Sequence, residues 1–160
     1  MTTREPRRRV SVALTRDTPA GPELLVFDHR DYPEAGTQMP GGGIDPGESV
    51  EQAAAREVGE ETGVTDVVVG RRLGEHDFPT PENTPQRTVV VHATTTETRD
   101  RWQHTVAGEG DDRGLVYLCR FVALHDAIAT LVDRQGELLH VLDDRSGPAN
   151  TAVPPWPPRS

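Results

Sequence analysis

Apolar side chains recur at every second position across residues 10–14, which is the period of a strand with one buried face. Residues 24–27 are apolar throughout, so a second strand is predicted there with both faces buried. The composition of residues 17–22, between them, indicates a turn. Three later segments are predicted strands from their β-branched or alternating apolar residues: 67–73, 87–95 and 115–124. On the last of these, one face is formed by Leu115, Tyr117, Cys119 and Phe121.

The most clearly bounded helix is predicted over residues 50–62. Ser49 is a favoured N-cap and stands three residues before Gln52, which is the spacing of a capping box. Gly63 supplies the left-handed residue that ends a helix. A buried stripe at i, i+4 and i+8 is formed by Val50, Ala54 and Val58. Residues 28–47 before the helix are rich in Gly and Pro and are predicted to form a loop.

A second helix is predicted at residues 136–142, within the last amphipathic stretch of the chain. The order strand, strand, helix, strands, strand, helix predicts an α/β fold with a mixed sheet and helices on both faces. The domain is expected to span residues 8–144, after an N-terminal arm at 1–7. Residues 145–160 form a Pro-rich tail that is expected to be disordered, with docking of its VPPWPP stretch to a polyproline-binding partner as the alternative.

The chain has 160 residues and a net charge of −9, which argues against a nucleic acid partner. All 17 basic residues are arginines, so chemistry that needs a lysine, such as Schiff-base formation, is excluded. The single cysteine, Cys119, is expected to be a buried thiol. No stretch is long and apolar enough for a membrane span, and the N-terminus lacks the apolar core of a secretory signal. A cytoplasmic protein without a membrane partner is expected.

Three glutamates crowd one face of the helix predicted at 50–62. Glu57, Glu60 and Glu61 stand at i, i+3 and i+4, and like charges at this spacing destabilise a helix by roughly 0.2–0.5 kcal/mol per pair. A hard divalent cation would convert this repulsion into a set of oxygen ligands. The glycines that follow Pro40 lack a Cβ, so backbone groups there can approach a ligand closely.

These residues fall into one pattern: Gly, five residues, Glu, seven residues, and then Arg-Glu-apolar-any-Glu-Glu-any-Gly-apolar. Its specified positions are filled by Gly42, Glu48, Arg56, Glu57, Val58, Glu60, Glu61, Gly63 and Val64. The pattern resembles the Nudix box and covers 23 of 160 residues. The resemblance implies an α/β/α sandwich, Mg²⁺ or Mn²⁺ as cofactor, and hydrolysis of a phosphoanhydride bond in a nucleoside diphosphate linked to another group. The partner would then be a small-molecule diphosphate, and a homodimer is compatible with the family.

The resemblance also assigns catalytic roles by position. The implied metal ligands are Gly41, through its carbonyl, and Glu57, Glu60 and Glu61. Arg56 would hold one of these carboxylates in place, together with Glu48. Gly42 and Gly63 would have structural roles in the box. The general base is left open between Glu60 and a later acidic loop that holds Glu109, Asp111 and Asp112.

Substrate contacts are harder to predict, because aromatic residues make up only 4% of the chain. Trp102 is a candidate to stack on a base or sugar, with packing in the core as the alternative. Arg120 is a candidate phosphate contact, although solvent or a carboxylate partner fits equally well. Glu109 and Asp112 are candidates to contact the substrate from their loop. His76, between two acidic residues, is expected to lie in an exposed polar turn.

The identity of the substrate stays open among ADP-ribose-like or sugar nucleotides, (d)NTPs including oxidised forms, and isoprenoid diphosphates. Pro79 stands 16 residues after Gly63, a spacing that resembles a marker of ADP-ribose members. The main alternative function is a Nudix-fold module that binds or senses a nucleotide without hydrolysing it. Such modules usually lose glutamates of the box, whereas this chain keeps all four of them.

Overall fold

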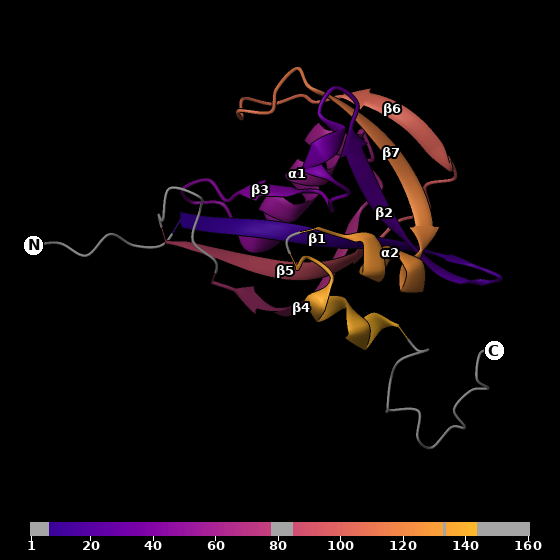
Figure 1. The fold of residues 1–160 in the computed structure, drawn as a ribbon. Coiled ribbons are helices and arrows are strands. Elements are labelled where there is room, and N and C mark those ends of the chain that lie inside the picture. Colours follow the sequence, from indigo (N-terminus) through magenta and orange to yellow (C-terminus); the bar gives the residue numbers. More distant parts are fainter. Residues whose placement is uncertain (1–6, 78–84, 133, 144–160) are drawn as a thin grey trace, which may run out of the picture.

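A mixed seven-stranded sheet forms the centre of the computed structural model, which describes residues 7–77, 85–132 and 134–143 (Figure 1). The strand order is β4-β5-β1-β2-β7-β6, with β3 paired to β1 beside this path. The strands are β1 (Arg7–Thr18), β2 (Gly21–His29), β3 (Gly41–Gly43), β4 (Val68–His76), β5 (Gln86–Thr94), β6 (Arg101–Thr105) and β7 (Val116–Ala123). The helices are α1 (Val50–Thr62), α2 (Leu124–Thr130) and the 3-10 helices η1 (Pro33–Ala35) and η2 (Glu137–Leu142).

The sheet forks along β1. The C-terminal end of β1, from Thr15 to Thr18, pairs with β2. Nearer the N-terminal end of β1, residues Arg9 to Ser11 pair with β3 along the same edge of the strand. Strand β2 instead continues alongside β7 and pairs antiparallel with it from Glu23 to His29. On its other side β1 runs parallel to β5. The fork separates β2 and β7 from β1 and β3, and this separation positions the site described below.

Helices cover both faces of the sheet, as predicted, and the core has two parts. Helix α1 packs against one face, where its buried residues join the alternate residues Val10, Val12 and Leu14 of β1. Helices α2 and η2 pack against the opposite face, around Ala13 and Val26. No helix among the described residues is both long and apolar enough to cross a bilayer.

Helix α1 has the bounds that its end signals predict. The Ser49 hydroxyl accepts a hydrogen bond from the Gln52 N–H, and the Gln52 side chain accepts one from the Ser49 N–H. Gly63 ends the helix in the left-handed conformation, with φ 78°. The predicted stripe of Val50, Ala54 and Val58 is buried. These signals are local in the sequence, which is why they could be interpreted without the fold.

Four elements differ from the sequence-based expectation. Strand β3 lies inside the segment predicted to be a loop, and β6 was not predicted at all. Helix α2 was not predicted and begins at Leu124, the last residue of the predicted strand 115–124, and the predicted last helix is a 3-10 helix. Each of these elements is short, and β3 consists of glycines only, so no side-chain period could reveal it. The arm, the Pro-rich tail and Pro79 lie outside the described residues, except for Arg7, which begins β1.

Candidate active site

The acidic face of α1 points toward the glycine strand β3 instead of into solvent. Glu57 and Glu61 are only 8% and 4% exposed. The Gly41 N–H donates a hydrogen bond to Glu61 Oε1 at 2.7 Å, and a Cβ on Gly42 would overlap the Glu57 carboxylate. The absence of side chains on β3 therefore leaves the space that the two carboxylates occupy. A glycine is therefore required at residue 42, the first position of the box.

Replacing Gly42 with alanine should lower catalytic turnover by about 10- to 100-fold, because the added methyl group must displace the Glu57 carboxylate from its position. Gly59→Ala is the matched control, since a Cβ there meets only an ordinary contact, 3.8 Å from the Val64 carbonyl oxygen. Steady-state kinetics of both variants would check this. Equal turnover in Gly42→Ala and the wild type would contradict the role given to the glycine strand.

Arg56 ties the acidic groups of the box together. Its guanidinium donates two hydrogen bonds to Glu48, at 2.7 and 2.8 Å, and others to Glu57 at 2.8 Å and Glu60 at 3.2 Å. It also donates to the Gly43 carbonyl at 2.9 Å. The hydrogen bond from Arg56 holds the pKa of Glu48 below its ordinary value. Arg56 thus links α1 to β3 and contacts two of the three glutamates, Glu57 and Glu60.

The buried glutamates carry negative charge that the protein compensates only in part. Burial raises the pKa of Glu57 to about 7, although the hydrogen bond from Arg56 opposes the shift. Burial also raises the pKa of Glu61, and a hydrogen bond with Asp112 adds to this shift. Carboxyl groups in this state bind either protons or a cation readily. Raised pKa values that burial and neighbouring charges cause are characteristic of functional sites.

The donor atoms of this cluster suit a hard divalent cation, since they are carboxylate oxygens that the fold has removed from water. Among the residues that the structure describes, however, no group of three His, Cys, Asp or Glu side chains is already close enough to hold a metal ion. Arg56 draws Glu57 and Glu60 toward itself, and Gly41 binds Glu61.

The later acidic loop does reach α1, but its three acids differ. Asp112 accepts a hydrogen bond from the Tyr117 hydroxyl at 3.1 Å and lies beside Glu61. Asp111 lines the same cavity as Glu61. Glu109 is exposed and does not line that cavity. Of the candidates in this loop, the structure therefore brings Asp112 to the buried glutamates, places the exposed Asp111 at the cavity, and leaves Glu109 outside.

A cavity of about 980 Å³ opens at the fork of the sheet, and its acidic lining residues are Glu57, Glu61, Asp111 and Asp112 but not Glu60. One wall is aromatic: the rings of Phe27 and Tyr117 stack at 4.0 Å, and the His29 ring meets Tyr117 at 4.6 Å. His29 lines the cavity, and its Nδ1 atom is buried and has no hydrogen-bond partner among the described residues. These three residues were not predicted as site residues, because Phe27 and Tyr117 lie within core strands and His29 has no motif around it.

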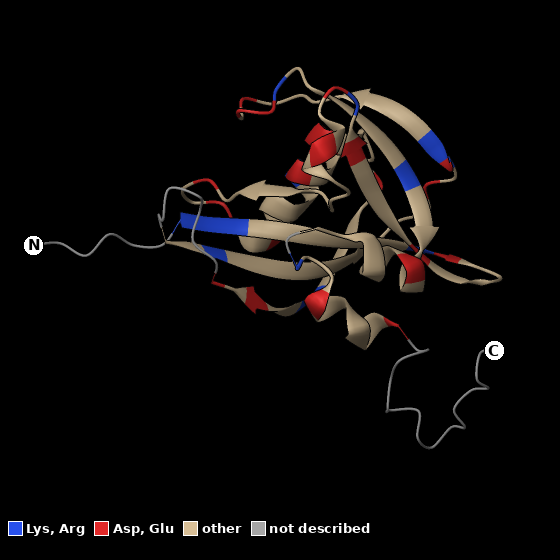
Figure 2. Ribbon diagram, viewed as in Figure 1, with Lys and Arg blue, Asp and Glu red and all other residues tan. Residues whose placement is uncertain are grey.

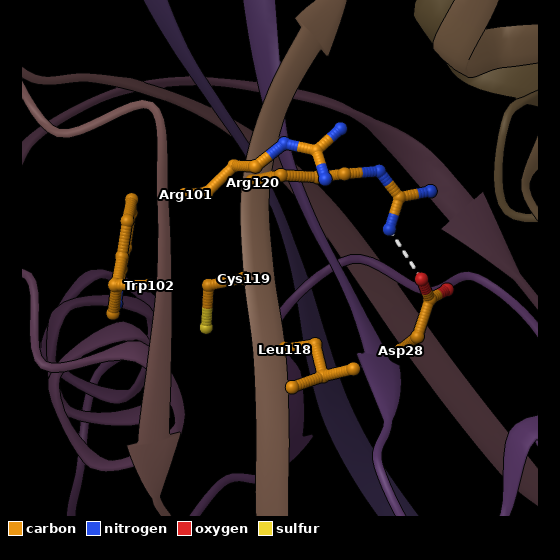
Figure 3. A pocket seen from close by; sticks show the side chains of 6 residues that line it. All are labelled: Asp28, Arg101, Trp102, Leu118, Cys119 and Arg120. Atoms are coloured by element: carbon orange, nitrogen blue, oxygen red, sulfur yellow. Dashed lines mark hydrogen bonds and ion pairs between the residues drawn. The ribbon is translucent and has the colours of Figure 1, made fainter.

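Trp102 and Arg120 lie away from this cavity, along a second hollow of about 330 Å³ (Figure 3). The Trp102 indole N–H donates to the Thr62 carbonyl at 2.7 Å, and the Arg99 guanidinium lies 4.3 Å from the indole ring. The Arg120 guanidinium forms an ion pair with the Asp28 carboxylate (Figure 3). The structure thus favours the alternatives stated for both residues, core packing for Trp102 and a carboxylate partner for Arg120.

Two histidines also have defined positions. His104 makes a hydrogen bond through Nε2 with the Glu60 carbonyl at 3.0 Å and so supports the end of α1. The expectation for His76 was wrong, because it is the last residue of β4 and its side chain is only 11% exposed. It lines the large cavity.

The family model of the NUDIX domain matches residues 5–142, so this chain belongs to the NUDIX family. The family prediction made from the box is therefore confirmed. Among solved structures, the chain is similar to a C. elegans Ap4A hydrolase, with a TM-score of 0.60, 21% identity, and coverage of 86% of this chain and 96% of that one. A Nudix hydrolase from M. smegmatis has a TM-score of 0.61 at 20% identity and covers 96% of this chain and 91% of its own. These similarities confirm the fold class.

Curated relatives match over a shorter stretch. An RNA pyrophosphohydrolase of Caulobacter vibrioides is 44% identical over 77 residues, which are 46% of this chain and 45% of that protein. An 8-oxo-(d)GTP phosphatase of Mycolicibacterium smegmatis is 43% identical over 70 residues, 44% of this chain and 21% of that protein. A diphosphoinositol polyphosphate phosphohydrolase 3-alpha of Mus musculus is 38% identical over 85 residues, 53% of this chain and 49% of that protein. The chain thus spans less than half the length of these relatives.

Proposed function

We propose that this chain is a pyrophosphohydrolase that uses Mg²⁺ or Mn²⁺ to cleave a phosphoanhydride bond in a nucleoside diphosphate linked to another group. The observation that carries the proposal is the burial of Glu57 and Glu61 against a strand of glycines, inside a cavity large enough for a nucleotide. A protein that only folded would not keep two acidic groups with raised pKa values in such a position. Membership of the NUDIX family, whose members generally use divalent metal ions, supports the same conclusion.

The residues that would hold the ion are the Gly41 carbonyl, Glu57, Glu60 and Glu61. When bound, the ion supplies charge that neutralises the phosphate oxygens and acidifies a water molecule. Arg56, fixed by Glu48, would keep Glu57 and Glu60 oriented. Tyr117 would orient Asp112 through its hydroxyl. Phe27, His29 and Tyr117 line the same cavity and would lie against a nucleoside bound there.

Two candidates remain for the group that takes the proton from the attacking water. Glu60 is partly accessible, with its side chain 24% exposed, and it lies on the same helix as the other ligands. Asp112 lies in the buried cluster beside Glu61. Glu60→Gln and Asp112→Asn should be compared over a pH series at saturating metal. In the wild type, turnover should fall at acidic pH as the general base becomes protonated. The residue whose substitution removes this fall is the base.

The relatives support the reaction class without fixing the substrate. Those reported above are an RNA pyrophosphohydrolase, an 8-oxo-(d)GTP phosphatase and a diphosphoinositol polyphosphate phosphohydrolase, and the similar structure is an Ap4A hydrolase. Each of these proteins is named for hydrolysis of a phosphorylated compound. A nucleotide sensor without hydrolysis is the competing function, but it would not need all four box glutamates together with Arg56.

A substrate panel with products identified by mass tests the proposal. The protein would be incubated with nucleoside triphosphates, dinucleoside polyphosphates, ADP-ribose and sugar nucleotides, each with Mg²⁺, Mn²⁺ or EDTA. We expect release of phosphate or a nucleoside monophosphate with metal and none with EDTA. Glu51→Gln is the matched control, because Glu51 lies on α1 but pairs with Arg72 at the surface. Nucleotide binding without any hydrolysis across the panel would establish the sensor function instead.

A further inference from the structure

One face of β1 and β5 forms the floor of the large cavity beyond the acidic cluster. Side chains alternate between the two faces of a strand, so every second residue of each strand faces the cavity. From β1 the lining residues are Arg7, Arg9, Val10 and Ser11. Arg7, Arg9 and Ser11 share one face of the strand, and their parallel partners on β5, which also line the cavity, are Gln86, Thr88 and Val90. Arg8 and Arg87 have the opposite parity and do not line the cavity. Figure 2 shows this basic end of β1 in blue.

The two arginines on this floor have no anionic partner in the described part of the chain. Arg16, Arg56 and Arg87, by contrast, each form ion pairs with carboxylates. Arg7 and Arg9 stand two residues apart on one face, about 7 Å along the strand, where like charges repel. In a chain with a net charge of −9, two adjacent cations without a carboxylate partner indicate a place for an anion that comes from outside.

This floor continues directly from the catalytic cluster. Gly41, whose N–H binds Glu61, pairs with Ser11 of β1, and Gly43 pairs with Arg9. Arg9 therefore lies about 7 Å along β1 from the position next to Glu61, and Arg7 about 13 Å. An anhydride held at the carboxylates would end near Ser11, and a longer anionic chain would extend from there toward the guanidinium groups that line the same cavity.

We propose that Arg7 and Arg9 form an anion subsite that selects substrates with further phosphate groups beyond the anhydride that is cleaved. The proposal deepens the function proposed above and rests on it for the position of the cleaved bond. Guanidinium groups bind phosphate through paired hydrogen bonds, and Ser11, Gln86 and Thr88 provide additional donors beside them. Among the candidate substrates, the subsite favours polyphosphates over diphosphates that end in an uncharged sugar or an isoprenoid group.

Kinetics of matched variants test the selectivity. The double variant Arg7→Gln/Arg9→Gln would be compared with Arg8→Gln, which removes one charge from the opposite face of the same strand. With adenosine tetraphosphate and Mg²⁺, we expect the double variant to lose at least tenfold in kcat/KM, mostly through KM. With ADP-ribose it should stay within threefold of the wild type, and Arg8→Gln should stay within twofold on both substrates.

Binding without turnover separates this inference from the proposed activity. Calorimetry with inorganic tripolyphosphate in EDTA and low salt should show one site in the wild type and in Arg8→Gln, and at least tenfold weaker binding in the double variant. Thermal unfolding of all three proteins would confirm that they are folded. Equal tripolyphosphate affinity in the double variant, or an equal loss in Arg8→Gln, would overturn the subsite. If the wild type binds tripolyphosphate through these arginines but hydrolyses no substrate, the subsite is supported and the proposed activity is wrong.

Discussion

Replacing Glu61 with glutamine is expected to abolish turnover and, at the same time, to raise the thermal stability of the metal-free protein at pH 8. Glutamine has the same shape, and its amide oxygen can still accept the hydrogen bond from the Gly41 N–H. The variant removes a carboxyl group whose ionisation the fold disfavours, because the group is buried and lies beside Asp112 and Glu57. Groups that only orient a metal ligand typically cost 10- to 100-fold when changed, so loss of a ligand should cost at least about 100-fold in kcat/KM.

The gain in stability should be about 1–2 kcal/mol, which corresponds to an increase of roughly 2–8 °C in Tm for a chain of this size. Calorimetry in EDTA and steady-state kinetics with Mg²⁺ would measure the two effects. Glu51→Gln, at the exposed start of α1, should change neither by much. If Glu61→Gln and Glu60→Gln both keep wild-type turnover, the assignment of the acidic face to catalysis is wrong. If Glu61→Gln loses both activity and stability, its role is structural.

The metal-free protein should also become less stable as the pH rises from 5 to 8. The pKa of Glu57 is about 7 in the folded protein, above the ordinary value of 4.5, so the folded state binds a proton that the unfolded chain has released. This contribution is fully present below pH 4.5 and is lost as the pH passes through about 7. The shift corresponds to roughly 3 kcal/mol across this window.

Thermal unfolding in EDTA at a series of pH values measures this effect. His92 contributes the opposite slope, because burial lowers its pKa and its neutral form is favoured in the folded state. The difference between the wild type and Glu57→Gln isolates the carboxylate, since His92 is common to both. Saturating Mg²⁺ should remove most of the difference in slope, because the ion replaces the proton. If the stability of the two proteins in EDTA changes equally with pH, ionisation of Glu57 does not destabilise the folded state, and the prediction is wrong.

Much of the fold followed from local signals. Helix α1 carries its own start at Ser49 and its own end at Gly63, so its bounds needed no tertiary information. The buried strands β1 and β2 were evident from their apolar residues. Strand β6, by contrast, has exposed residues at alternate positions and lies at the edge of the sheet, so its pattern carries little apolar signal. Strand β3 depends on pairing with β1 and on space for Glu57, which no local rule encodes.

The acidic cluster could be predicted because one helix brings its glutamates together at fixed spacing. The rest of the cavity could not, because it depends on the fork of the sheet. Phe27 and Tyr117 come from two strands that only the fold places side by side. Arg7 and Arg9 could be assigned to the cavity only once the fold showed which face of β1 they share and that β5 lies beside them. Trp102 attracted interest as a rare aromatic residue, but its indole N–H holds the last turn of α1.

In the proposed function, the buried glutamates of α1 bind a divalent ion. Titration with Mn²⁺, followed by electron paramagnetic resonance with and without a nucleotide, tests it most directly because it does not depend on finding the substrate. We predict saturable Mn²⁺ binding in the wild type and in Glu51→Gln, and loss of that binding in Glu57→Gln and Glu61→Gln. Unchanged Mn²⁺ uptake in the last two variants, or none in the wild type under either condition, would contradict the account.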